Sequence, residues 1–288
     1  MLEAIATSPG LLVSGTVVLG LVVGSFLTVV AHRLPLMMER EWRRHCAELA
    51  GEAPPAEPPL NLVVPRSRCP GCGRAIRAVE NIPLASFLAL RGRCPGCGRF
   101  IGWRYPAIEL ASAALAGIAA WRFGLSPALG AALVYAWALL ALTAIDLERQ
   151  LLPDQITLPL LWAGLLWNLG PWGFVPLADA VAGAAAGYLF LWGVYHAFRL
   201  LTGKEGMGYG DFKLLAAIGA WTGWQMLPLV VLGASLIGAL VGGGLIAAGR
   251  RRREVPIPFG PFLAGAGWIA LLWGEALTAA YLRWTGLV

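Results

Sequence analysis

At residues 206–214 the chain reads Gly-Met-Gly-Tyr-Gly-Asp-Phe-Lys-Leu, which places one carboxylate between a glycine-rich approach and a hydrophobic segment. An acid next to the hydrocarbon of a membrane is energetically expensive, so Asp211 is a candidate functional group. The glycines permit unusual backbone angles and let an extended substrate come close to the acid. The stretch therefore predicts a reactive site at the edge of a membrane segment.

A second candidate acid, Asp146, closes the apolar run at residues 136–145. Two carboxylates a few ångströms apart can share one proton, because both cannot carry a charge at such a distance. One of them then activates a water, and the other protonates the leaving nitrogen of a peptide bond. We predict that Asp146 and Asp211 meet at one membrane face and cleave a peptide bond there.

The composition indicates a membrane protein. Hydrophobic residues make up 58% of the 288 residues and charged residues 13%, and the mean hydropathy is +0.69. Several apolar runs approach the roughly 20 residues needed to cross a bilayer. We expect an all-α polytopic fold with about eight transmembrane helices, at 11–31, 107–122, 127–145, 156–170, 177–198, 212–224, 227–248 and 262–282. The first run lacks a basic leader and a small-residue cleavage site, so we expect it to be retained as a span.

The basic residues predict the orientation. With the amino terminus outside, all but two of the 22 lysines and arginines fall on inner segments, the exceptions being Arg122 and Arg283. This is the positive-inside pattern, and it places Asp146 and Asp211 on the cytoplasmic face. The net charge of +6 therefore reflects the membrane topology first and attraction to anionic lipid second. It does not indicate nucleic-acid binding. The run at 250–253 is predicted to be a cytoplasmic anchor.

The strongest single motif is Cys-Pro-Gly-Cys-Gly-Arg, which occurs at residues 69–74 and again at 94–99. Two such knuckles complete a tetrahedral four-sulfur site, the preference of structural zinc. Disulfides are disfavoured because the predicted topology puts this loop in the reducing compartment. A thioredoxin-like redox pair is disfavoured because no βαβ pattern surrounds the cysteines. The predicted zinc ligands are Cys69, Cys72, Cys94 and Cys97.

These features divide the chain into three predicted parts. Residues 1–35 form the first transmembrane helix, and residues 36–105 form a small cytoplasmic zinc-ribbon-like domain in which a short polar helix precedes a proline-rich linker. Residues 106–288 form a seven-helix membrane core that carries the two aspartates.

Three other charged residues have simpler structural explanations. Asp154 opens the predicted span at 156–170 and is a natural helix cap. A lipid-interface position is predicted for Lys213. Glu109 either caps its helix or pairs with Arg104, or else contacts the active site or the amino terminus of a substrate.

Seven motifs occur together in an order that resembles the type IV prepilin peptidases, the bifunctional leader peptidases and N-methyltransferases of type IV pilus and type II secretion systems. The resemblance extends from about residue 20 to 285. One residue departs from it, because Thr28 stands where the family usually carries asparagine. The motifs are Gly24–Pro35, the doubled Cys-Pro-Gly-Cys, Glu80–Leu84, Arg104–Leu110, Asp146 with Leu152–Thr157, Gly206–Leu214 and Ile257–Leu263.

The resemblance implies that Asp146 and Asp211 are the catalytic pair of an aspartic endopeptidase in the bacterial inner membrane. It implies cleavage of prepilins and pseudopilins after the glycine that ends a short basic leader, on the cytoplasmic face. S-adenosylmethionine would then methylate the new amino terminus, and the four-cysteine region would belong to this second activity. Gly92 and Glu109 are candidates for binding the methyl donor, and no oligomeric state is predicted.

Two other classes of protein stay open on sequence grounds. An ion- or proton-coupled transporter would also place acids near the membrane, although closer to the middle of its spans. A non-enzymatic assembly scaffold would need the four-cysteine region but not the two aspartates.

Overall fold

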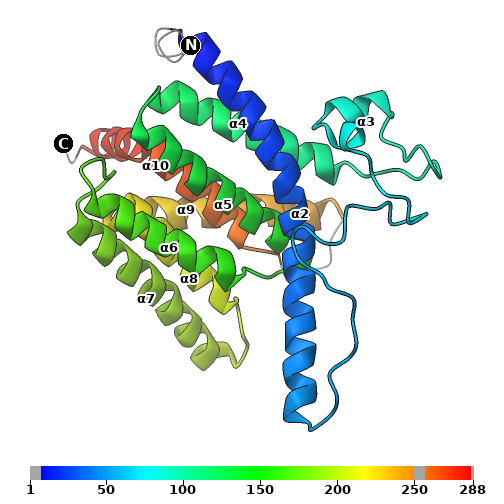
Figure 1. Cartoon of the computed structure of the whole chain (residues 1–288). Helices are drawn as coiled ribbons and strands as arrows, with labels where there is room; N and C mark the ends of the chain where they lie inside the picture. Colours follow the sequence, from blue (N-terminus) through cyan, green and yellow to red (C-terminus); the bar gives the residue numbers. More distant parts are fainter. Residues whose placement is uncertain (1–7, 250–256, 287–288) are drawn as a thin grey trace. The chain divides into compact units, whose positions relative to one another are not determined.

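The computed structural model describes residues 8–249 and 257–286 (Figure 1). Within these ranges the chain is helical, and its β-structure is confined to two isolated bridges, which confirms the predicted all-α class. The predicted anchor at 250–253 lies outside the described residues. The chain divides into two compact units, Met1–Leu125 and Ser126–Val288, whereas the sequence places the start of the protease core at residue 106.

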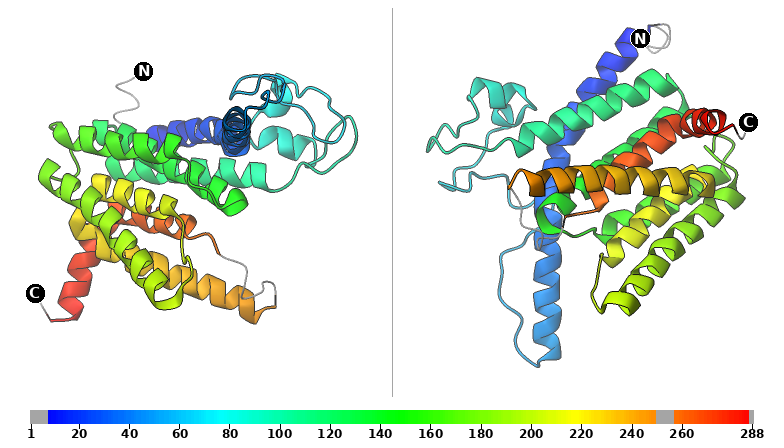
Figure 2. Two further views of the ribbon diagram at one scale, coloured as in Figure 1. Left: turned by 90° about the horizontal axis from the view of Figure 1, so that it is seen from below. Right: turned by 180° about the vertical axis from the view of Figure 1, so that it is seen from behind.

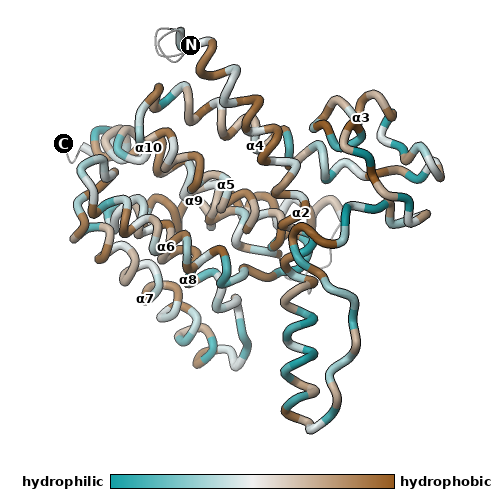
Figure 3. The backbone as a smooth tube through the Cα atoms, in the orientation of Figure 1, coloured by the Kyte–Doolittle hydropathy of each residue, from teal (hydrophilic) through white to brown (hydrophobic). Residues whose placement is uncertain are grey.

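The first unit is built on α2, a single helix of 41 residues from Pro9 to Leu49. At about 1.5 Å per residue it is about 60 Å long, twice the thickness of the hydrocarbon of a bilayer. Polar residues gather on its carboxy-terminal half (Figure 3). The sequence predicts a boundary at residue 35, but Pro35 lies inside α2 and does not end it. A proline removes one helical hydrogen bond, and α2 continues through that loss.

Helix α4 (Arg104–Phe123) packs along α2 through small residues. A Cβ on Gly20 would lie 2.7 Å from the Cα of Ala113, and a Cβ on Gly24 would lie 2.8 Å from the Cα of Glu109. The hydroxyl of Ser112 donates to the carbonyl of Gly20 at 2.6 Å. This close approach of two backbones is typical of membrane helices, and it holds Glu109 beside α2.

The four-cysteine region lies between α2 and α4 and contains two short helices, η1 (Ala78–Asn81) and α3 (Ala85–Ala89). The two knuckles have the same backbone shape. An isolated antiparallel bridge closes each one, Arg68 with Ala75 and Arg93 with Phe100. Gly73 and Gly98 both have a φ of +70°, a conformation that glycine adopts without steric cost. The repeat in the sequence is therefore also a repeat in the structure.

The second unit is a helical bundle. Its short helix α8 is the most buried element, since eleven of its residues, Asp211, Phe212 and 214–222, are buried. Its described helices are α5 (Pro127–Arg149), α6 (Asp154–Leu169), α7 (Leu177–Thr202), α8 (Tyr209–Thr222), η2 (Trp224–Met226), α9 (Leu227–Ala247) and α10 (Gly260–Trp284).

Helices α6 and α7 hold α8 in place. Helices α7 and α8 run side by side (Figures 1 and 2), and Gly183 and Gly219 bring their backbones into direct contact. From α8, the indole Nε1 of Trp221 donates to the carbonyl of Leu160 on α6 at 2.8 Å. From α6, the side-chain amide of Asn168 donates to the carbonyl of Ala220 at 2.8 Å. These contacts fix the helix whose first turn carries Asp211.

Five helices among the described residues are long and apolar enough to cross a membrane, namely α2, α5, α7, the η2–α9 segment and α10. The three remaining predicted spans are also helical, as α4, α6 and α8, with 20, 16 and 14 residues. The chain is thus a multi-pass membrane protein, and the total of eight spans stays a prediction.

Candidate functional site

The first predicted acid, Asp146, lies in the last turn of α5 and is buried. The helix ends shortly after it, because Gln150 adopts the left-handed conformation with a φ of +51° and its N–H closes on the Asp146 carbonyl at 2.9 Å. The Asp146 carboxylate accepts a hydrogen bond of 3.0 Å from the backbone N–H of Gly260, the first residue of α10. The start of α10 therefore orients this carboxylate.

The second acid, Asp211, lies in the first turn of α8 and is also buried. It is the third residue after the capping residue Gly208, and its carboxylate accepts a hydrogen bond from the backbone of that glycine. An acid at this position of a helix satisfies one of the free amides of the first turn. The carboxylates of Asp146 and Asp211 are close enough to interact electrostatically, so the fold brings the two predicted acids together.

Leu152 lies between two glycines next to these acids. A Cβ on Gly210 would lie 2.7 Å from the Cβ of Leu152. A Cβ on Gly260 would lie 3.2 Å from the Cδ2 of Leu152 and 2.6 Å from the Oδ2 of Asp146. The leucine thus spaces the starts of α8 and α10, and both positions require glycine because a side chain would displace either the leucine or the carboxylate.

Asp154 and Lys213 form an ion pair of 2.7 Å that joins the start of α6 to α8. The capping residue of α6 is Pro153, so Asp154 does not cap the helix with its side chain. The prediction that Asp154 is a helix cap is therefore wrong. Its carboxylate binds Lys213, for which the sequence predicts a lipid-interface position, so this lysine also has a protein partner.

The four predicted zinc ligands lie together. Their sulfur atoms are all within 4.8 Å of one another, and the Sγ atoms of Cys69 and Cys97 are 3.7 Å apart. A tetrahedral zinc with sulfur at about 2.3 Å places its ligands about 3.8 Å apart. Hydrogen bonds from the backbone amides of Gly71 and Cys72 lower the pKa of the Cys69 thiol to about 6, which favours the thiolate that a metal binds. The donor set fits a structural zinc ion.

Glu109 is buried, and its Oε2 accepts the backbone N–H of Leu84 at 2.9 Å. Glu109 therefore contacts the loop between the knuckles. Gly92 has a φ of +67°, and a Cβ there would lie 2.9 Å from the ring of Phe87. Glu109 and Phe87 both line a cavity of about 400 Å³ within the first unit, and Thr28 lines it too.

Two contributors to the aspartate site were not predicted from the sequence. Leu152 is an ordinary leucine between apolar neighbours, and nothing in the sequence marks its contact with two glycines. Gly260 falls in a proline-rich stretch that sequence patterns interpret equally as a loop or as a groove wall. The isolated glycine between Phe259 and Pro261 is the one signal that a close backbone approach occurs there.

Comparison with known protein families matches residues 133–243 to the type IV leader peptidase family and residues 18–123 to the bacterial peptidase A24 N-terminal domain. Among individual relatives, the prepilin leader peptidase/N-methyltransferase of Pseudomonas aeruginosa is 54% identical over 99% of both chains. The proteins of the same name from Aeromonas hydrophila and Burkholderia pseudomallei are 57% and 56% identical, over 98% and 95% of this chain and 98% and 89% of theirs. No solved structure matches the chain.

Proposed function

Because the chain belongs to the type IV leader peptidase family, we propose that Asp146 and Asp211 are the two acids with which it cleaves the leader of a prepilin. The protein is a prepilin-cleaving, N-methylating peptidase. The relatives' names favour neither the transporter nor the scaffold that the sequence left open. The observation that carries the assignment is the meeting of these two buried carboxylates at the ends of α5 and α8.

The surrounding residues suit a peptidase dyad. One carboxylate takes a proton from a water while the water oxygen attacks the scissile carbonyl, and the other gives a proton to the departing nitrogen as the C–N bond breaks. The Gly260 amide holds Asp146 in place, and Leu152 packs against Gly210 and Gly260 beside the pair. Of the three glycines before Asp211, Gly208 leaves room for an extended peptide, because a Cβ there would meet nothing closer than the Oδ2 of Asp211 at 3.9 Å. Gly206 and Gly210 instead pack against Phe198 and Leu152.

The substrates are prepilins and type II secretion pseudopilins, cut after the glycine that ends a basic leader. The apolar helix of such a substrate lies in the inner membrane beside the enzyme. Its leader stays on the cytoplasmic side, where Asp146, Asp154 and Asp211 attract positive charge. The distribution of basic residues supports this orientation.

The second activity transfers a methyl group from S-adenosylmethionine to the new amino terminus, as the relatives' names imply. We assign the four cysteines to a structural zinc ion, because all four ligand positions are filled by protein and the sulfur spacing suits zinc. That ion would hold the short, loop-rich region between α2 and α4 in one shape.

The test of the dyad is a cleavage assay with the full-length protein in detergent and a purified prepilin. Asp146→Asn and Asp211→Asn keep the side-chain size and remove the titratable group, so each should lower the cleavage rate by at least about 10²-fold. Asp179→Asn is the matched control, since this acid lies in the first turn of α7 and binds Trp224 at 3.1 Å. Normal turnover in either of the first two variants would exclude the proposed pair.

A further inference from the structure

The first unit contains a cavity of about 400 Å³ that the peptidase reaction does not use. Its volume falls within the range of about 300–1,000 Å³ that is usual for small-molecule sites. One wall is a stripe of α2 at helical spacing, formed by Ser25, Thr28 and Val29 with residues one turn further along. The first turns of α4 and the two cysteine knuckles form the other walls.

The two knuckles differ in their charges at this cavity. Arg74 and Arg99 hold equivalent places in the repeat, and each covers the glycine of the opposite knuckle. Arg74 binds Glu80 at 2.6 Å, and this hydrogen bond lowers the pKa of the Glu80 carboxyl. Arg99 lines the cavity and has no acidic partner among the described residues. A cation that lacks its counterpart beside a cavity is available to an anionic group of a ligand.

A second pair of equivalent residues differs in its position relative to the cavity. Arg68 and Arg93 each precede the first cysteine of a knuckle, and each forms the bridge that closes it. Arg68 lines the cavity and Arg93 does not. In the described part of the chain neither arginine has an ion-pair partner. Arg66 also lines the cavity without an ion-pair partner among the described residues. The knuckle side of the cavity therefore carries three guanidinium groups without an acidic partner, those of Arg66, Arg68 and Arg99.

On the opposite side, Glu109 presents a buried carboxylate. Its partner Leu84 has a φ of +55° and a ψ of −45°, at the centre of a tight turn in which the Ala85 N–H donates to the Pro83 carbonyl at 2.5 Å. A leucine in this conformation is strained, and such strain gathers at functional sites. The Leu84–Glu109 hydrogen bond holds this strained turn against α4.

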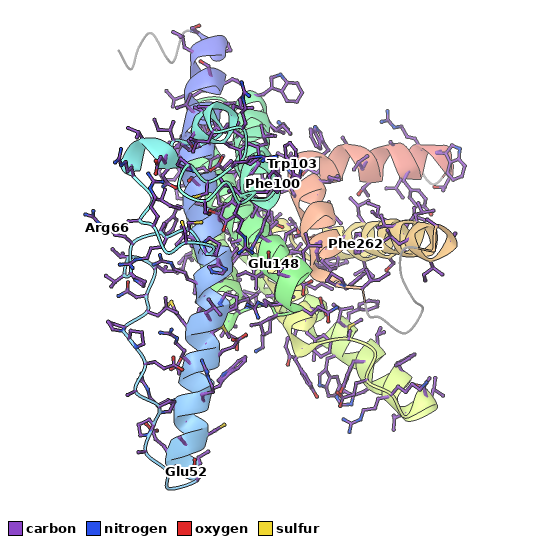
Figure 4. The ribbon with its side chains drawn as sticks, turned by 90° about the vertical axis from the view of Figure 1, so that its right-hand side faces the viewer. Glu52, Arg66, Phe100, Trp103, Glu148 and Phe262 are labelled. Carbon is purple, nitrogen blue, oxygen red and sulfur yellow. The ribbon has the colours of Figure 1, made fainter. Side chains whose placement is uncertain are left out.

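Aromatic rings complete the lining. Phe87 and Phe100 line the cavity, and with Trp103 they form a cluster in which the ring centroids are 5.4 to 6.4 Å apart. Figure 4 shows Phe100 and Trp103 next to each other. Such faces bind a flat heterocycle by stacking. Cys69 and Cys94 also belong to the lining, so the metal site and the cavity share a wall.

We propose that this cavity is the binding site for the methyl donor S-adenosylmethionine, an inference that rests on the proposed methyltransferase function. The donor carries one carboxylate, two cationic groups and an adenine ring. Arg68 and Arg99 bind the carboxylate, Glu109 binds the ammonium group, and the aromatic cluster packs on the adenine.

An anionic lipid headgroup is the competing occupant, because arginines near a bilayer also attract phosphate. Glu109 argues against it. A buried carboxylate repels a phosphate and attracts the positive charge that the methyl donor carries and phosphatidylglycerol lacks. The combination of unpaired arginines with a buried acid fits a zwitterionic ligand.

The experiment uses the full-length protein in nanodiscs and two probes. Tritiated S-adenosylmethionine is crosslinked by ultraviolet light and the labelled peptide is identified. The affinity for S-adenosylhomocysteine, which cannot transfer a methyl group, is measured by calorimetry. We expect the label within residues 25–109. Arg68→Gln, Arg99→Gln and Glu109→Gln should each weaken S-adenosylhomocysteine binding by about tenfold or more. Arg93→Gln, the matched control in the repeat, should leave the affinity within twofold.

Label within residues 126–288, or wild-type affinity in all three cavity variants, would overturn the assignment while leaving the methyltransferase function intact. Absence of binding by the wild-type protein would count against the methyltransferase function itself. Nanodiscs with and without phosphatidylglycerol separate the two occupants. A loss of S-adenosylhomocysteine affinity of tenfold or more in the anionic discs would identify the cavity as a headgroup site and overturn the proposal.

Discussion

The carboxylate of Asp146 is oriented by Gly260, a residue 114 positions further along the chain. The contact depends on the absence of a side chain, because a Cβ at residue 260 would fall 2.6 Å from the carboxylate oxygen. A single methyl group would therefore move the acid or the start of α10.

Gly260→Ala should lower kcat for prepilin cleavage by about 10²-fold, because a displacement of about 1 Å in a catalytic group has an effect of this size. A steady-state cleavage assay that separates kcat from KM measures the change. Gly265→Ala on the same helix is the control, since a Cβ there meets nothing within 4 Å. Equal rates for the two alanine variants would show that Gly260 does not position Asp146.

At this scale the sequence identifies candidate residues for the chemistry but not the residues that hold them in place. The energetic cost of an acid near a membrane marks Asp146 and Asp211 without a structure. The spacing of the four cysteines marks them in the same way. Leu152 and Gly260 act through a contact between distant segments, and no local pattern encodes it. Asp154 was predicted to be a cap, and its partner Lys213 is 59 residues away.

Among the elements, α2 and α4 form one packed pair that supports the cavity. Their contact depends on small residues, because the backbones approach closely at Gly20 and Gly24. Two helices at this separation place the cavity stripe of α2 opposite Glu109. No local pattern in the sequence identifies α4 as the partner of these two glycines.

Gly20→Val should destabilise this pair by about 1–3 kcal/mol, because its side chain would overlap the backbone of α4. Thermal unfolding of the full-length protein in detergent should show a lower apparent Tm. Gly15→Val places the same β-branched residue on the same helix at a position where a Cβ meets nothing within 4 Å. An unchanged Tm in Gly20→Val would mean that the α2–α4 contact does not limit stability.

The sequence also predicted a break in the first element that does not occur. The predicted first transmembrane helix ends at residue 35, and a separate short polar helix was predicted beyond it. Composition changes at the membrane surface, but the hydrogen-bonding geometry of a helix does not have to change there. For this reason α2 continues to Leu49.

Over the whole molecule, the two chemistries are assigned to different compact units. The cysteines and the cavity belong to residues 1–125, and the two aspartates belong to residues 126–288. The sequence already separates the metal-binding spacing from the two acids, and the division of the two activities between these regions stays a prediction. It could not locate the cavity, which forms from segments far apart in the chain.

Removal of the metal should therefore separate the two activities. Prolonged chelation of the full-length protein should release about one zinc ion per chain and weaken S-adenosylhomocysteine binding by tenfold or more, since Cys69 and Cys94 form part of the cavity wall. Prepilin cleavage should change by less than about twofold. Metal analysis and the two assays on one sample check this, with a variant carrying serine at all four cysteines as the metal-free reference. Cleavage that declines in step with zinc content would contradict the assignment.

The burial of α8 separates Asp211 from the lipid. This helix has 14 residues, and the neighbouring helices cover it along 214–222. Hydrophobic mismatch therefore acts on the outer helices of the unit, which can tilt to suit a thinner or thicker bilayer. The height of Asp211 relative to Asp146 is set by protein contacts instead, so a change in acyl-chain length leaves the spacing of the two carboxylates unaltered.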